Sequence, residues 1–223
     1  MTFDLPVLRQ EIDAGHIETV IVAMTDMQGR LQGKRLHGPF FLEQVAHHGT
    51  EGCSYLLAVD VDMNTVDGYQ MASWHSGYGD FVMQPDFGTL RRIPWHPATA
   101  MVQADVLWED GRGVDASPRQ VLKAQLARLA DAGLQAFAGT ELEFIVFSDS
   151  YEQAWRQGYR DLSPANQYNV DYSIQGTSRI EPLLRRIRLA MAGAGMYVES
   201  VKGECNHGQH EIVFGYADAL TAC

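Results

Sequence analysis

Gly139-Thr-Glu-Leu-Glu-Phe-Ile-Val-Phe147 is rich in aromatic and β-branched residues, a composition that favours a short β-strand. Because successive strand side chains point to opposite faces, Glu141 and Glu143 share one face of this strand. The other face carries three apolar side chains, Leu142, Phe144 and Val146. Two carboxylates at close range repel by about 1 kcal/mol in water and roughly 4 kcal/mol at an intermediate dielectric. The pair therefore indicates either a solvated face or a bound cation.

The bulk composition narrows the class of protein. The 223 residues include 28 acidic and 17 basic side chains, giving a net charge of −11, which argues against a general nucleic-acid or anionic-membrane binder. Three cysteines without a Cys-x-x-Cys motif suit reduced thiols, and the N-terminus has no basic-then-apolar signal pattern. No apolar run approaches the ~20 residues of a membrane span. We therefore expect a cytoplasmic protein that binds neither nucleic acid nor membrane.

Residues 1–110 predict a small mixed α+β domain with a hairpin-rich sheet. Apolar residues recur at helical spacing over 3–14, where Asp4 is the expected N-cap. The further elements expected are strands at 17–24 and 30–36, a short helix at 41–48, strands at 54–59 and 100–107, and a long polar loop at 60–80.

Residues 111–223 predict a second domain, which begins after turn-forming residues at 109–115. Its first helix is expected to start at Ser117, with Pro118 in the first turn and Gln120 completing a capping box. The apolar stripe of this helix consists of Val121, Leu122, Leu126 and Leu129. A second helix is expected to start at Ser178, with Glu181 at the capping-box position and a stripe of Ile180, Leu183, Leu184, Ile187 and Met191.

The last strands, 196–201 and 211–214, read as an antiparallel hairpin that carries three more glutamates. Glu199, Glu204 and Glu211 would join the first pair on one sheet face, where five carboxylates repel strongly unless divalent cations neutralise them. Such oxygen ligands favour Mg²⁺ or Mn²⁺ over zinc. A zinc site remains an alternative, because Cys205, His207 and His210 form a Cys-x-His-x-x-His cluster.

The order of motifs resembles the glutamine synthetase superfamily of ATP-dependent carboxylate–amine ligases. The matching motifs run over nearly the whole chain, and only their joint order and spacing is specific. They are Asp26-Met-Gln-Gly-Arg-Leu-Gln-Gly-Lys34, Gln84-Pro-Asp-Phe-Gly-Thr-Leu-Arg91, Ile93-Pro-Trp95, Ser117-Pro-Arg119, Gly139-Thr-Glu-Leu-Glu-Phe144 and Gly208-Gln-His-Glu-Ile212. The resemblance implies an α+β fold, in which a β-grasp-like N-terminal domain precedes a catalytic domain built on a curved antiparallel sheet.

The resemblance also implies roles for individual residues. Glu143, Glu204 and Glu211 match the ligands of one divalent metal ion, and Glu141 matches a ligand of a second. Two positions match the ATP site: Glu199 matches a glutamate of the nucleotide site, and Tyr216 an aromatic residue near the adenosine. Asp67, followed by Gly68 and Trp74, resembles a segment that reaches a neighbouring subunit's active site in ring-shaped homo-oligomers. Its carboxylate would bind and deprotonate the incoming amine.

The implied reaction joins ammonia or an amine to the γ-carboxylate of glutamate through a γ-glutamyl phosphate, with ATP as co-substrate. Two departures point away from ammonia and towards the branch that uses polyamines or other amines. One residue fewer separates Glu204 from Glu211 than in many ammonia-using members, and Tyr69-Gln70 follows Gly68 where small hydroxyl residues are usual.

The length is a further departure from the family pattern. The motifs that would complete the second metal site and the glutamate site do not follow within the 223 residues. We therefore expect this chain to correspond to the N-terminal half of such a ligase, inactive by itself, with an exposed sheet edge prone to pairing. A non-catalytic relative that kept the fold for a structural or regulatory task is the alternative.

Overall fold

The computed structural model describes residues 3–71 and 77–222, so Trp74 lies outside the described residues. The chain divides into two compact units, Met1–Ala136 and Phe137–Cys223. Helices and mostly antiparallel strands are mixed in both units, which confirms the expected α+β class.

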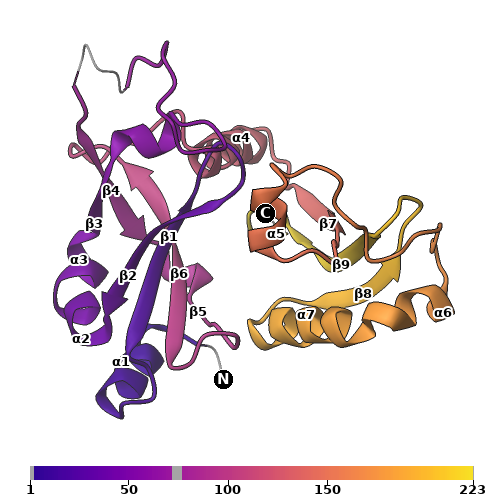
Figure 1. Ribbon diagram of the computed structural model, residues 1–223. Coiled ribbons are helices and arrows are strands. Elements are labelled where there is room, and N and C mark those ends of the chain that lie inside the picture. Colours follow the sequence, from indigo (N-terminus) through magenta and orange to yellow (C-terminus); the bar gives the residue numbers. More distant parts are fainter. Residues whose placement is uncertain (1–2, 72–76, 223) are drawn as a thin grey trace. The chain divides into compact units, whose positions relative to one another are not determined.

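The first unit is built on a six-stranded sheet with the strand order β2-β1-β6-β4-β3, and β5 adds to β6 (Figure 1). The central strands β1 and β6 run parallel, and all other described pairs in this sheet are antiparallel. The strand bounds are β1 Thr19–Thr25, β2 Leu31–His37, β3 Thr50–Cys53, β4 Asp80–Pro85, β5 Arg91–Arg92 and β6 Thr99–Leu107. A hairpin beside a parallel central pair is the arrangement expected of a β-grasp-like domain.

One face of this sheet holds the core of the first unit. Strand β6 alternates strictly between buried and half-buried residues, and its buried set is Ala100, Val102, Ala104 and Val106. The covering helices are α1 (Leu5–Asp13) and the continuous helical run α2 (Gly38–Phe40), η1 (Phe41–Val45) and α3 (Ala46–His48). Asp4 caps α1 as predicted, because its carboxylate accepts a hydrogen bond from the amide of Val7.

The strand predicted at 54–59 is wrong. Ser54–Leu57 forms the 3₁₀ turn η2, and both Ser54 and Leu57 are fully buried. A short apolar run does not distinguish a buried turn from a strand, which explains the error. The strand lies just before it, as β3, where the absence of a side chain at Gly52 leaves room for the ring of Phe81 on β4.

Helix α4 (Pro118–Asp131) follows Ser117 as predicted, but the predicted capping box does not form. The Ser117 hydroxyl is buried without a hydrogen-bond partner, and the Gln120 side chain lies against Gly113. Arg119 instead anchors the start of α4 to the sheet side of the unit, because its guanidinium forms ion pairs with Asp86 and Asp105.

The apolar stripe predicted on α4 is only partly buried. Val121 is 48% exposed, and Leu122, Leu126 and Leu129 are half-buried. The compact division falls after this helix, at 136, whereas the domain boundary expected from the sequence lies between 110 and 111. The boundary between 110 and 111 remains a prediction of where two independently folding domains meet.

The second unit is built on a three-stranded antiparallel sheet with the order β7-β9-β8. The strand bounds are β7 Phe137–Ile145, β8 Val198–Gly203 and β9 Gln209–Asp218, which confirms the predicted terminal hairpin. Register shifts at 138/140 and 198/200 mark bulges, which bend the strands and curve the sheet. The remaining elements are α5 Tyr151–Arg156, α6 Ile174–Thr177, η4 Ser178–Ile180, α7 Glu181–Gly193, α8 Ala219–Ala222 and, in the first unit, η3 Phe87–Thr89.

Helix α7 runs alongside β8 (Figure 1), and Leu184 is the residue of its predicted stripe that is fully buried. The predicted start at Ser178 is wrong, because Ser178 belongs to a 3₁₀ turn and α7 begins at Glu181. Glu181 does not complete a capping box; its carboxylate pairs with Arg188 further along the helix.

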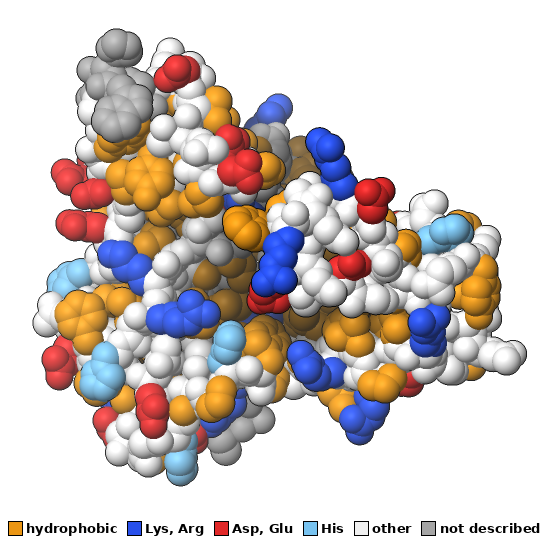
Figure 2. All heavy atoms as spheres, in the orientation of Figure 1, with side chains coloured by type: hydrophobic (Ala, Val, Ile, Leu, Met, Phe, Trp, Pro, Cys, Tyr) orange, Lys and Arg blue, Asp and Glu red, His pale blue; other side chains and the backbone are white. Residues whose placement is uncertain are grey.

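Strand β7 is an edge strand, paired on one side with β9 within the described residues. Its apolar side chains are only partly covered, since Leu142 is 54% exposed and Phe144 is half-buried. No helix of the described part is long and apolar enough to cross a membrane. On the face drawn in Figure 2, the Lys and Arg side chains are dispersed among other residue types.

Candidate metal and nucleotide site

Three charged side chains lie in one row across the sheet of the second unit. Glu143 on β7 is the register partner of Glu211 on β9, and Glu211 is in turn the partner of Lys202 on β8. Residues that are partners in neighbouring strands present their side chains on the same face. Glu141 lies two residues before Glu143 and therefore shares this face, as predicted.

Glu204 completes a carboxylate triad with Glu143 and Glu211. It follows the end of β8, and its amide donates to the carbonyl of Gln209, which closes the hairpin over the row. One oxygen from each of the three carboxylates lies within 4.8 Å of the other two. Two oxygens that bind one Mg²⁺ at about 2.1 Å lie at most about 4.2 Å apart, so small side-chain movements suffice for a shared cation.

Burial and hydrogen bonding shift the pKa values of Glu211 and Glu204 in opposite directions. Glu211 is only 4% exposed, and burial raises its pKa, helped by the hydrogen bond to Glu204. Glu204 has the opposite shift, because the hydrogen bond from Lys202 lowers its pKa. Burial of a carboxylate beside others is costly unless a cation accompanies it, and a divalent ion with oxygen preference fits this donor set.

Lys202 supplies a cation to this cluster. Its ammonium contacts Glu204, lies 3.5 Å from a carboxylate oxygen of Glu211 and 3.9 Å from one of Asp171. It also lies 4.7 Å from the centre of the Tyr172 ring. The hydrogen bond with Glu204 raises the pKa of Lys202, so the ammonium stays charged.

A pocket of about 340 Å³ lies along the same sheet. It is lined by Gly139, Thr140, Glu141, Glu199, Val213, Phe214 and Tyr216. The structure thus brings together three predicted residues, Glu141, Glu199 and Tyr216, in one cavity. The ring of Tyr216 is 72% exposed and stacks on Phe137, with ring centres 5.5 Å apart. The accessible aromatic face suits a flat ring, whereas the carboxylates of Glu141 and Glu199 would repel phosphates unless a bound cation lies between them.

The alternative zinc cluster is not assembled. His210 is fully buried and lies in the register row of Phe144, one residue out of phase with Glu211 and therefore on the opposite face. Its Nδ1 atom lies 2.9 Å from the carbonyl of Gly208, and burial lowers its pKa. Among the described residues, the metal-capable group that contains Cys205 includes Asp171 and Glu204, and neither His207 nor His210.

Comparisons with known proteins bear directly on this geometry. Residues 115–223 match the family model for the glutamine synthetase catalytic domain. A gamma-glutamylethanolamide synthetase of Streptomyces coelicolor is 66% identical over 212 residues, which cover 95% of this chain and 46% of that protein. The chain belongs to the glutamine synthetase superfamily.

Other members show the same partial overlap. A glutamate–isopropylamine ligase of a Pseudomonas species is 31% identical, over 96% of this chain and 47% of its own length. The solved structure described as "Apo GmaS without ligand" has a TM-score of 0.73 at 25% identity, covering 99% of this chain and 47% of that one. The chain therefore spans about half the length of the relatives it matches.

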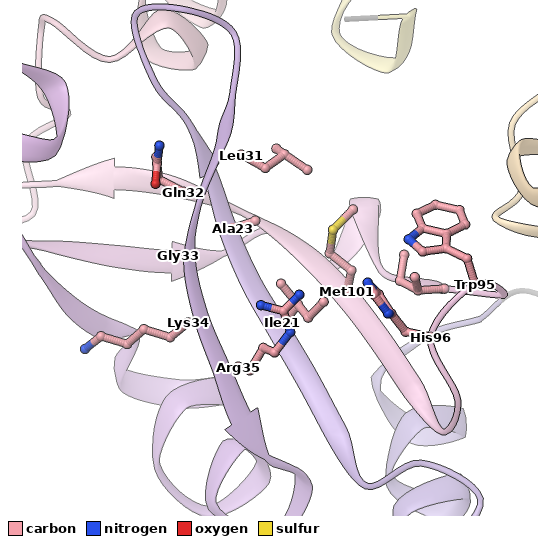
Figure 3. A pocket seen from close by; sticks show the side chains of 11 residues that line it. Ile21, Ala23, Leu31, Gln32, Gly33, Lys34, Arg35, Trp95, His96 and Met101 are labelled. Atoms are coloured by element: carbon pink, nitrogen blue, oxygen red, sulfur yellow. The ribbon is translucent and has the colours of Figure 1, made fainter. Parts of the chain in front are cut away.

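Asp67, the residue matched to amine binding in the superfamily, belongs to the first unit. It is exposed and follows directly on Val66, whose amide donates to the carbonyl of Ala58. The first unit also has a cavity of about 360 Å³ on the open face of its sheet, and none of its lining residues is a predicted site residue. Figure 3 shows Arg35, Met101, His96 and Trp95 gathered along it, with Lys34 pointing the other way.

Two residues of the second unit's site were missed from the sequence. Lys202 has a detectable signal, because it lies only two residues before Glu204 in the same arm of the hairpin. Asp171 has none, because it lies in the irregular segment before α6 and reaches Lys202 and Cys205 only through the tertiary fold.

Proposed function

We propose that this chain contributes the first metal site and part of the ATP site of a ligase that joins a small amine to the γ-carboxylate of glutamate. The observation that carries the proposal is the triad of Glu143, Glu204 and Glu211, in which Glu143 and Glu211 are register partners and Glu204 follows β8. A pocket on the same sheet is lined by Glu141, Glu199 and Tyr216. The names of the relatives support an amine rather than ammonia as the nitrogen donor.

Each residue has a part in the proposed reaction. Glu143, Glu204 and Glu211 would hold one Mg²⁺ or Mn²⁺ ion, and Glu141 would help to hold a second. Such cations neutralise charge on ATP phosphates during phosphoryl transfer. Tyr216 would stack near the adenine, and Glu199 would contact the nucleotide in the same pocket.

The proposed ligation proceeds in two steps. A γ-carboxylate oxygen of glutamate attacks the terminal phosphorus of ATP, which forms γ-glutamyl phosphate and releases ADP. The amine nitrogen then attacks the acyl carbon, inorganic phosphate leaves, and the amine gives up a proton. Asp67 would accept that proton as a general base. A homo-oligomer in which Asp67 serves a neighbouring copy is part of this proposal.

A hybrid ligase tests the proposal. In this hybrid, the present chain replaces the equivalent region of the Streptomyces coelicolor relative. With glutamate, ATP and Mg²⁺, we expect phosphate release that depends on ethanolamine, with γ-glutamylethanolamide detected by mass spectrometry. Isopropylamine and ammonia are the comparison substrates. Glu143→Ala and Glu211→Ala should abolish turnover, whereas Glu152→Gln on the surface helix α5 should not. Retained turnover in either triad variant would refute the site.

A further inference from the structure

Asp26 is a buried carboxylate at the tip of the β1–β2 hairpin, 1% exposed. One of its oxygens accepts hydrogen bonds from the amides of Gln28, at 2.9 Å, and Arg30, at 2.8 Å. The other accepts from the side chains of Arg30, at 2.8 Å, and Gln32, at 3.1 Å. This network fixes both the turn and the orientation of the Arg30 guanidinium.

The outer end of Arg30 reaches a segment thirty residues further along the chain. Its two terminal nitrogens donate to the carbonyls of Val61, at 2.6 Å, and Asp60, at 3.2 Å. Gln28 adds a bond from its side-chain amide to the carbonyl of Val59, at 2.9 Å. Three consecutive main-chain carbonyls are thus held from the hairpin by two neighbouring side chains.

The segment that they hold is closed on itself. Val59 and Thr65 form an antiparallel bridge, and the carboxylate of Asp60 accepts from the amides of Asp62 and Asn64. These bonds tie the loop to itself, and Asp67 follows it directly. Residues 61–70 are all exposed, whereas Val59 at the start of the segment is buried. Burial therefore secures the start of the segment, and the hydrogen bonds from Arg30 and Gln28 hold its exposed part.

We propose that Arg30 and Gln28 are positioning residues, which dock residues 59–66 on the hairpin and thereby place the Asp67 carboxylate for the amine. This inference rests on the proposed function, in which Asp67 accepts the amine proton. Arg suits the task because its planar fork binds two carbonyls while it remains paired with Asp26. Neither residue is proposed to touch the substrate.

Hydrogen exchange of the 223-residue chain tests the docking without any substrate. We expect Arg30→Ala and Gln28→Ala to speed the exchange of amides 60–66 about tenfold, while β6 amides stay protected. Arg30→Lys keeps a cation beside Asp26, so this variant is expected to fold even if Arg30→Ala does not. It should speed the exchange of amides 60–66 by an intermediate factor. Arg35→Ala removes an arginine from the same hairpin without touching the segment and should change nothing. Unchanged exchange in the three docking variants would overturn the inference.

Kinetics of the hybrid ligase separate this inference from the proposed function. We expect Gln28→Ala and Arg30→Lys to raise the KM for ethanolamine about tenfold, with the KM values for ATP and glutamate changed less than twofold. Asp67→Asn is the reference variant, because it removes the proposed general base itself. If Asp67→Asn impairs amine use and the docking variants do not, the positioning role is overturned and the proposed role of Asp67 stands. If Asp67→Asn has no effect, the proposed role of Asp67 fails, and the positioning role fails with it.

Discussion

Glu143 and Glu211 lie directly opposite each other on the neighbouring antiparallel strands β7 and β9. Directly opposed like charges destabilise a sheet, so this pairing has a cost that a shared cation removes. Lys202 meets part of that requirement from the third strand.

Metal binding should depend on the buried member of the triad. Glu211→Gln removes one charged ligand while keeping the shape, and we expect Mn²⁺ affinity of the chain to fall at least tenfold, since each carboxylate supplies direct coordination. Electron paramagnetic resonance of free Mn²⁺ measures this. Glu152→Gln removes a carboxylate of the same unit outside the triad and should bind as the parent chain does. Equal affinities for all three proteins would contradict the triad.

Lys202 should compete with a divalent cation. Its ammonium contacts Glu204 and lies 3.5 Å from Glu211, so a metal ion bound there is repelled by a like charge at close range. We expect Lys202→Met to tighten Mn²⁺ binding by about tenfold and to enlarge the rise in Tm on adding metal. Weaker binding in Lys202→Met would show that Lys202 supports the metal site.

Tyr216 should contribute a stacking surface for adenine. We expect Tyr216→Ala to weaken the binding of a non-hydrolysable ATP analogue to the hybrid ligase by about tenfold, because aromatic stacking on a base is worth roughly 1–3 kcal/mol. Isothermal titration calorimetry gives the dissociation constant. Tyr151→Ala on α5, where the ring is 90% exposed, serves as the matched control. An unchanged constant for Tyr216→Ala would place the adenine elsewhere.

Arg119 should be a main anchor of α4. It is 8% exposed and pairs with Asp86 and Asp105, so its removal takes the ion-pair partner from Asp86 and leaves Asp105 with Lys123, at 2.6 Å. We expect Arg119→Ala to lower the free energy of unfolding by about 3 kcal/mol in urea titrations. Arg128→Ala, which removes an exposed arginine of the same helix, should change it by less than about 0.5 kcal/mol. A similar loss in both would argue for a general helix effect.

Asp26 should confer acid sensitivity. Burial alone would raise its pKa, but hydrogen bonds from the Arg30 amide and from the side chains of Gln32 and Arg30 outweigh burial, so the folded pKa is lowered. The stabilisation is therefore complete above the unfolded pKa of about 3.9 and is lost as pH falls through the lower, folded pKa.

We expect Asp26→Asn to cost about 2 kcal/mol at pH 7. The deficit relative to the parent chain should shrink as the pH of urea titrations is lowered from about 5 to 2. A deficit that is independent of pH would contradict the ionised network.

The sequence by itself determined the local features of this protein. Alternation placed Glu141 and Glu143 on one strand face, and the hairpin that carries Glu204 and Glu211 was readable from its pattern and turn residues. The family resemblance came from the order of short motifs. These features depend on residues close together in the chain, where geometry repeats with a known period.

Only the tertiary structure decided the contacts between distant segments. Strand register set Glu143 against Glu211, and no local pattern specifies a register pair between residues 68 positions apart in the chain. The same holds for Arg119, whose ion pairs with Asp86 and Asp105 fix the start of α4 in place of the expected Ser117 cap. Arg30 shows the principle most clearly, because its five donors are shared between its own turn and carbonyls thirty residues away. Such partners are selected by the free energy of the whole fold, which a reading of neighbouring residues does not contain.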